Sequence, residues 1–186
     1  MPPSPIRWSK SLYHEMADSG WFRDKRVQLI EGEIIEMAPM GTQHWVVVNT
    51  TYRTLLPRFP LDRFTISIQC PIDLGLDSEP EPDIAVIKGI PTDFANALPT
   101  ANSIQLVIEV SDSSLVFDRE RKARIYAAAG IVEYWVMDIS ARTVEVYRAP
   151  IAAESRYGKV TIYRGDESIT TAAGDGKPIP VSDLMF

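Results

Sequence analysis

Residues 103–138 begin with SIQLVIEVS (103–111) and end with EYWVMD (133–138), with a charged segment between these two runs. Both runs are rich in β-branched and aromatic residues, which is typical of buried strands. The charged segment is long enough to cross over a sheet as a helix. The stretch therefore predicts a βαβ unit, and this unit places Glu109 inside a strand.

A carboxylate in a buried strand needs a partner. An unpaired ionised carboxylate is costly there, so the group is normally protonated, paired with a cation or bound to a metal. A second acid, Asp83, follows the extended segment SEPEP (78–82) and opens the apolar run 84–87, so it lies at the mouth of another strand. We expect Asp83 and Glu109 at the same edge of one sheet.

Lys122 lies on the helix that we expect from Asp118 to Ala129, before Gly130. Two carboxylates and a backbone carbonyl, here that of Val110, can hold Mg²⁺, and an ammonium beside them can orient a water that attacks a phosphate. The alternatives are a surface ion pair of Lys122 with Asp118, or a buried ion network with no substrate. The residues alone leave these readings open.

Composition limits the class of protein. The chain has 186 residues, 45% hydrophobic and 24% charged, which fits one soluble globular domain over residues 1–186. Its net charge of −6 argues against a broad basic surface that coats nucleic acid, although it allows a local basic cleft. Cys70 is the only cysteine, so we expect it in the core of a protein from a reducing compartment. With no signal pattern and no run of 18 apolar residues, the sequence favours a cytoplasmic protein away from membranes.

The remaining elements are predicted from periodicity and from residues typical of turns and caps. Glu31-Gly32 fits the turn of a tight hairpin, and His44 falls in the first turn of a helix, where it could ligate a metal, contact phosphate or only pack. The three hairpin acids Glu31, Glu33 and Glu36 could likewise be plain surface acids, or one of them could reach the site. The expected elements are a helix over 11–19 capped by Ser9 or Ser11, a hairpin over 26–37, a helix over 43–56 capped by Thr42, an alternating strand over 64–70, a short helix over 93–97, antiparallel strands over 143–147 and 159–163, and a tail over 174–186 that docks Leu184 and Phe186.

Pro82-Asp83 followed by Glu109-Val110-Ser111 resembles the PD-(D/E)xK motif of restriction-endonuclease-like nucleases. The chain more closely resembles the Uma-type family of bacterial endonucleases, over most of its length. The residues that carry this resemblance are LIEGE (29–33), His44, PDIAV (82–86), IEVS (108–111), Asp118, Lys122, Tyr126, Gly130 and EYW (133–135).

The resemblance implies an α/β (α+β) fold with a restriction-endonuclease-like core, in which helices flank a central mixed sheet and a β-hairpin precedes it. It implies hydrolysis of nucleic-acid phosphodiester bonds, with DNA as the expected substrate and Mg²⁺ or Mn²⁺ as the cofactor. By analogy with related nucleases we expect a homodimer. The resemblance implies metal-binding roles for Asp83 and Glu109 and makes Lys122 the catalytic lysine. We expect secondary roles for His44, Glu31, Gln28, Ser111 and Asp118, with Arg119, Arg121 and Arg124 available to phosphates.

The chain departs from these patterns at two positions. Ser111 stands two residues after Glu109, where the wider superfamily has its lysine, and in the Uma-type family that lysine lies on the next helix, as Lys122 does here. The family hairpin usually reads Glu-Leu-Ile-Asp-Gly, whereas this chain has Gln28 in the first position. Gln28 cannot be an anionic ligand, although Glu31 could replace it. An inactive nuclease-fold protein that binds nucleic acid or acts as a regulatory dimer is therefore the alternative.

Overall fold

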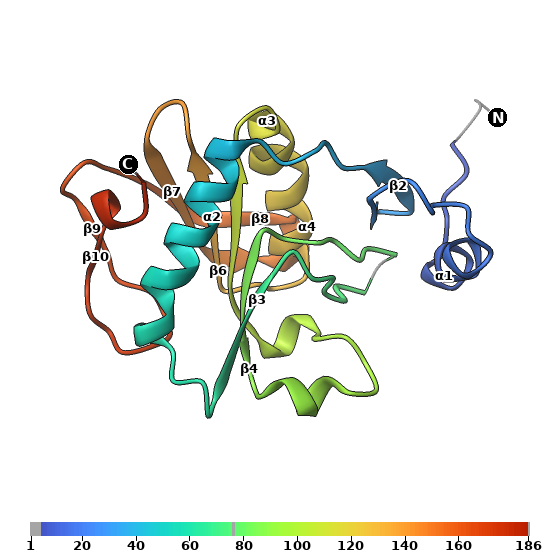
Figure 1. Cartoon of the computed structure of the whole chain (residues 1–186), viewed down its shortest axis with the longest axis horizontal. Coiled ribbons are helices and arrows are strands. Elements are labelled where there is room, and N and C mark those ends of the chain that lie inside the picture. The colour runs from blue at the N-terminus through green and yellow to red at the C-terminus, as the bar shows by residue number, and fades with distance from the viewer. Residues whose placement is uncertain (1–4, 76, 186) are drawn as a thin grey trace.

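The computed structural model describes residues 5–75 and 77–185. A six-stranded mixed sheet of order β3-β4-β5-β6-β7-β8 forms its centre, and helices cover both faces (Figure 1). This confirms the predicted α+β architecture. The elements are α1 (Lys10–Asp18), β1 (Val27–Ile30), β2 (Glu33–Glu36), α2 (Thr42–Leu55), η1 (Leu56–Arg58), β3 (Phe64–Ile68), β4 (Ile84–Lys88), η2 (Pro91–Phe94), η3 (Ala101–Ser103), β5 (Ile104–Ser111), α3 (Leu115–Phe117), η4 (Asp118–Lys122), α4 (Ala123–Ala128), β6 (Glu133–Asp138), β7 (Thr143–Ile151), η5 (Ala152–Glu154), β8 (Arg156–Arg164), β9 (Ser168–Ile169), β10 (Ile179–Pro180) and η6 (Val181–Asp183).

The predicted βαβ unit is present. Strands β5 and β6 pair in parallel, and α3, η4 and α4 cross over between them. Strand β4 pairs antiparallel with β5, with Ile84 opposite Ile108. The start of β4 and the end of β5 therefore meet at one edge of the sheet, which brings Asp83 opposite Glu109.

Both faces of the central strands are buried, which explains their nearly continuous apolar sequences. On one face, Val47 and Val48 of α2 belong to a core cluster with Ile108 and Trp135. On the other face, Tyr126 of α4 belongs to a second cluster built on alternate residues of the same strands, such as Val107 and Val136. The sheet is thus a rigid platform for side chains at its edge.

The N-terminal hairpin of β1 and β2 is separate from the central sheet and lies to one side of it (Figure 1). Its turn residues Glu31 and Gly32 both have left-handed backbones, with φ of 50° and 74°, as the predicted two-residue hairpin turn requires. Helix α1 begins after Ser9, whose hydroxyl accepts a hydrogen bond from the backbone of Leu12 at 3.3 Å. Tyr13 of α1 packs on the hairpin strand β1 through Val27 and Leu29.

Several predictions of local structure were wrong. Thr42 is the first residue of α2, and Gly41 occupies the N-cap without a side-chain bond. Cys70 is exposed because it lies beyond the end of β3, whose residues are all half-buried and do not alternate. The crossover helix begins at Leu115, earlier than expected, and the short helix lies over Pro91–Phe94.

The C-terminal segment docks on the α2 face through β10 and the buried Leu184, as predicted, and Phe186 falls outside the described residues. Among the described residues, no helix is long and apolar enough to cross a membrane.

Candidate active site

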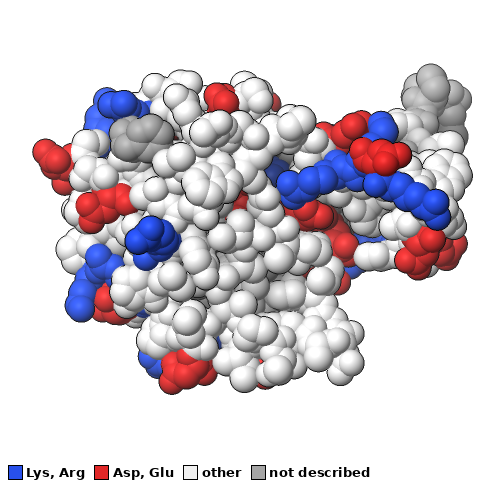
Figure 2. All heavy atoms as spheres, viewed as in Figure 1, with Lys and Arg blue, Asp and Glu red and all other residues white. Residues whose placement is uncertain are grey.

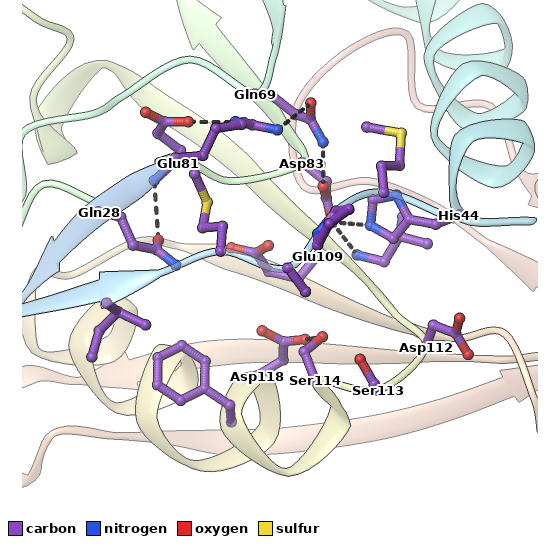
Figure 3. A pocket seen from close by; sticks show the side chains of 18 of the residues that line it. Gln28, His44, Gln69, Glu81, Asp83, Glu109, Asp112, Ser113, Ser114 and Asp118 are labelled. Carbon is purple, nitrogen blue, oxygen red and sulfur yellow. Dashed lines mark hydrogen bonds and ion pairs between the residues drawn. The ribbon is translucent and has the colours of Figure 1, made fainter. Parts of the chain in front are cut away.

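A pocket of about 310 Å³ opens where β4 begins and β5 ends, between the sheet edge, α2, η4 and the hairpin (Figure 3). Figure 2 shows a band of basic side chains over acidic ones in the hollow where the N-terminal part meets the main body. The polar and charged side chains that line the pocket come from segments far apart in sequence. They include Arg26, Gln28, Glu36, His44, Gln69, Glu81, Asp83, Glu109, Asp112, Ser113, Ser114, Asp118 and Lys122, and Val110 lines it as well.

Asp83 is held by three donors. Its Oδ2 accepts hydrogen bonds from His44 Nε2 at 3.0 Å and from the backbone N–H of Val110 at 2.9 Å, and its Oδ1 accepts one from Gln69 Nε2 at 3.1 Å. Burial alone would raise the pKa of Asp83, but the bonds from His44 and Val110 and the charge of Lys122 lower it below its ordinary value. Asp83 is therefore an ionised carboxylate with a fixed orientation at neutral pH.

The same contact acts on His44. Burial would lower the pKa of this imidazole, but its bond to Asp83 and the negative charges of Asp83 and Glu109 raise it above its ordinary value. His44 therefore lies at the site, as a donor to Asp83.

Glu109 is almost fully buried, and its Oε1 accepts hydrogen bonds from Lys122 Nζ at 2.8 Å and from the Tyr126 hydroxyl at 2.7 Å. Burial raises the pKa of Glu109 to about 8; Lys122 opposes this shift, and the charges of Asp118 and Asp83 add to it. Near neutral pH this carboxyl group is therefore largely protonated.

Lys122, which contacts Glu109, is the last residue of a π-helical turn in the crossover helix, η4. Such turns are frequent at functional sites. The turn buries both Asp118 and Lys122, with Lys122 Nζ 3.9 Å from Asp118 Oδ1. Burial would lower the pKa of Lys122, but Glu109 and Asp118 raise it above its ordinary value, so the side chain stays an ammonium. The surface ion pair considered for Lys122 and Asp118 is wrong, because Lys122 is buried and its shorter contact is to Glu109.

Ser111 and Asp118 support this turn. Asp118 Oδ2 accepts hydrogen bonds from the hydroxyls of Ser111 at 2.8 Å and Ser114 at 2.6 Å. Ser111 thus ties the end of β5 to the helix that carries Lys122.

Other predicted site residues lie elsewhere. Glu31 is in the hairpin turn, outside the pocket, where it pairs with Arg121 at 3.3 Å and with Arg124. Arg119 is engaged by Glu145 and lies 3.5 Å from Asp138. Arg119, Arg121 and Arg124 therefore all form ion pairs with acidic side chains outside the pocket.

Gln28 does line the pocket, and its Oε1 accepts a hydrogen bond from the backbone N–H of Glu81 at 3.3 Å. It fixes the segment that leads to Asp83.

Sequence reasoning missed Arg26, Gln69 and Glu81, which also line the pocket. Arg26 Nη2 lies 3.0 Å from Glu81 Oε2, and its Nη1 donates to Gln69 Oε1 at 3.3 Å. The position of Glu81 could have been predicted from the sequence, because it lies two residues before Asp83 on an extended segment. Side chains two residues apart on such a segment point to the same side. Arg26 and Gln69 reach the pocket only through the tertiary fold.

The site thus combines an acid at the start of β4, another near the end of β5 and a lysine from the crossover helix. A sequence model of the Uma2 family, described as "Putative restriction endonuclease", matches residues 12–174, and the chain belongs to this family.

A solved structure gives the same fold. The chain resembles the crystal structure of a "putative nuclease belonging to DUF820" from Anabaena variabilis, with a TM-score of 0.71 and 17% sequence identity over 97% of each chain. At this identity the likeness concerns the fold alone. No curated protein matches the chain.

Proposed function

We propose that the protein is a metal-dependent endonuclease that hydrolyses phosphodiester bonds of DNA, with a single domain and a cytoplasmic location. The observation that carries this proposal is the meeting of Asp83 and Glu109 at one sheet edge with the buried ammonium of Lys122. Cleavage of plasmid and of single-stranded DNA with Mg²⁺ or Mn²⁺, and its loss in EDTA, tests the proposal.

The donor set fits a small divalent cation. Mg²⁺ often takes only one or two protein carboxylates and keeps several waters. Asp83, Glu109 and the backbone carbonyl of Val110 would hold it. In residues 5–75 and 77–185 no three His, Cys, Asp or Glu side chains form a metal-ligand group, so waters and substrate oxygens would complete the shell. Three acids, Asp83, Glu109 and Asp118, share the pocket with Lys122 and His44, and a divalent cation would offset the negative charge that appears when Glu109 loses its proton.

The cation, when bound, polarises the phosphate and lowers the pKa of a water. Lys122 would orient the attacking water and oppose the negative charge that develops on the phosphorus centre. The water oxygen forms the new P–O bond while the bond to the leaving oxygen breaks. One proton of the water passes to solvent and the leaving oxygen takes up another, which yields a phosphate monoester and a hydroxyl group.

One observation favours a second candidate. Gln28 lines the pocket where the family usually has an acid, so the fold could bind nucleic acid, or act as a regulatory dimer, without turnover. Binding of DNA by a protein that takes up Mn²⁺ but does not cleave would indicate this alternative. The homodimer expected for either function is measurable by sedimentation equilibrium.

His44→Ala should lower DNA cleavage about 10- to 100-fold without abolishing it, because a residue that orients a metal-binding carboxylate typically contributes this much. Cleavage rates at saturating Mn²⁺ would measure the loss. His14→Ala is the matched control, since His14 is the other histidine of the chain and pairs with Glu79 outside the pocket. Equal activity of both variants would exclude His44 from the site, and a loss as complete as that of Asp83→Asn would make it central.

Mn²⁺ affinity should rise with pH through the neutral range. The pKa of Glu109 is raised to about 8, so below this pH a proton competes with the metal, and affinity should gain up to roughly tenfold per pH unit. Calorimetry in two buffers of different ionisation enthalpy should detect about one released proton near neutral pH. An affinity independent of pH, with no proton release, would exclude Glu109 as a ligand.

A further inference from the structure

We propose that Gln69 is a positioning residue that holds the carboxylate of Asp83, and that Arg26 fixes the orientation of the Gln69 amide. The inference deepens the proposed function and rests on it for the role of Asp83 in metal binding. Neither Arg26 nor Gln69 is among the residues that carry the resemblance to nuclease families.

The backbone conformation of Gln69 directs its side chain to Asp83. Gln69 follows β3 and has a left-handed backbone with φ of 50°, which is unfavourable for a residue with a side chain. Its N–H lies 3.2 Å from the carbonyl oxygens of both Pro82 and Asp83. The turn therefore binds the backbone of Asp83 while the side chain of Gln69 binds its carboxylate (Figure 3).

The chemistry of the three side chains allows one arrangement. Arg26 can only donate and an ionised Asp83 can only accept, so the amide between them must point Oε1 at Arg26 and Nε2 at Asp83. A carboxylate at position 69 would repel Asp83, and an ammonium there would repel Arg26. An amide is the group that satisfies both neighbours.

The hydrogen bonds from Arg26 through Gln69 to Asp83 connect the N-terminal hairpin with the edge of the central sheet. Arg26 immediately precedes the hairpin strand β1, and its half-exposed side chain also pairs with Glu81. The position of the hairpin is thereby coupled to the orientation of Asp83. Without Gln69, Oδ1 of Asp83 has lost its hydrogen-bond donor, and the two remaining donors, His44 and Val110, both bind Oδ2. The carboxylate held at one oxygen can then turn about its χ2 angle.

Two variants separate the amide from backbone strain. Gln69→Gly removes the amide and relieves the left-handed backbone, whereas Gln69→Met keeps the side-chain length and the strain but has no amide. Calorimetry should show Mn²⁺ affinity reduced about 10- to 100-fold in both. Gln69→Gly should retain the wild-type melting temperature or exceed it. Gln105→Met is the matched control, because the Gln105 amide binds Ser103 outside the pocket, and it should bind Mn²⁺ as the wild type does.

A double-mutant cycle tests the part of Arg26. Arg26→Ala should weaken Mn²⁺ binding less than Gln69→Gly, and the double variant should bind no more weakly than Gln69→Gly alone. Additive losses would show that Arg26 acts without Gln69. Wild-type affinity in Gln69→Gly, or a loss confined to Gln69→Met, would overturn the positioning role.

A metal-free crystal structure of Gln69→Gly separates this inference from the proposed function. The Asp83 carboxylate should be rotated about its χ2 angle relative to the wild type, and an unmoved carboxylate would refute the inference. A wild type that neither binds Mn²⁺ nor cleaves DNA would instead refute the metal-dependent nuclease, whatever the position of Asp83 in the variant.

Discussion

Asp83→Asn is expected to abolish Mn²⁺ binding and to lower DNA cleavage roughly 10³-fold or more, because a bound metal contributes several kcal/mol of transition-state stabilisation. Asp83 is the acid whose lowered pKa keeps it ionised at neutral pH, and an amide in its place retains the shape but not the charge. Calorimetry with Mn²⁺ and plasmid cleavage measure the two effects. Unchanged Mn²⁺ affinity in this variant would show that Asp83 is not a metal ligand.

The stability of the same variant without metal distinguishes two views of the pocket. If Asp83 and Glu109 only repelled each other, the substitution would stabilise the fold by about 1 kcal/mol or more. The folded pKa of Asp83 is instead lowered, so its ionised form contributes stability above the unfolded pKa, and this is lost as pH falls through the folded pKa. We therefore expect a lower melting temperature for Asp83→Asn near neutral pH. The difference should shrink in acid.

Lys122→Met is expected to lower turnover roughly 10²-fold or more while Mn²⁺ binding persists, because it removes a charge that opposes the developing negative charge on the phosphate. Stability should also fall, since Lys122 is buried and pairs with Glu109 at 2.8 Å. The fall should be smaller than the about 3–5 kcal/mol of an orphaned buried charge, because Glu109 can hold its proton near neutral pH.

Lys88→Met controls for the change in net charge, since Lys88 is exposed at the far end of β4 from Asp83. It should cleave DNA as the wild type does. If Lys122→Met also cleaves at the wild-type rate, the catalytic cation must be another residue that lines the pocket, and Arg26 becomes the first candidate.

The sheet and its central acids were predictable because strands buried on both faces have a recognisable composition. The SIQLVIEVS and EYWVMD runs became the parallel pair β5 and β6, and the antiparallel pairing of β4 with β5 brought Asp83 opposite Glu109. An acid within a buried strand stands out in the sequence, since burial makes it costly.

The rest of the site depends on contacts between distant segments. Lys122 lies three and four residues before Ile125 and Tyr126, so helical periodicity places it on their buried face near the end of β5, but the π-helical turn of η4 is not signalled by any residue pattern. The arginines of this crossover helix are predicted to contact phosphates, and the ion pairs of Arg121 with the hairpin acids Glu31 and Glu33 could not be predicted because they join distant segments. Gln69 reaches Asp83 through a left-handed backbone that no residue pattern signals, because glutamine rarely adopts it.

Incubation of the purified protein with supercoiled plasmid and with single-stranded DNA, in Mg²⁺, Mn²⁺ or EDTA, tests the central claim most directly. Asp83→Asn, purified in the same way and shown to be folded by circular dichroism, controls for a contaminating nuclease. We predict cleavage by the wild type with at least one of the two metals, none in EDTA, and none by Asp83→Asn. Cleavage that persists in EDTA or in Asp83→Asn, or none by a wild type that binds Mn²⁺ and DNA, would contradict the account.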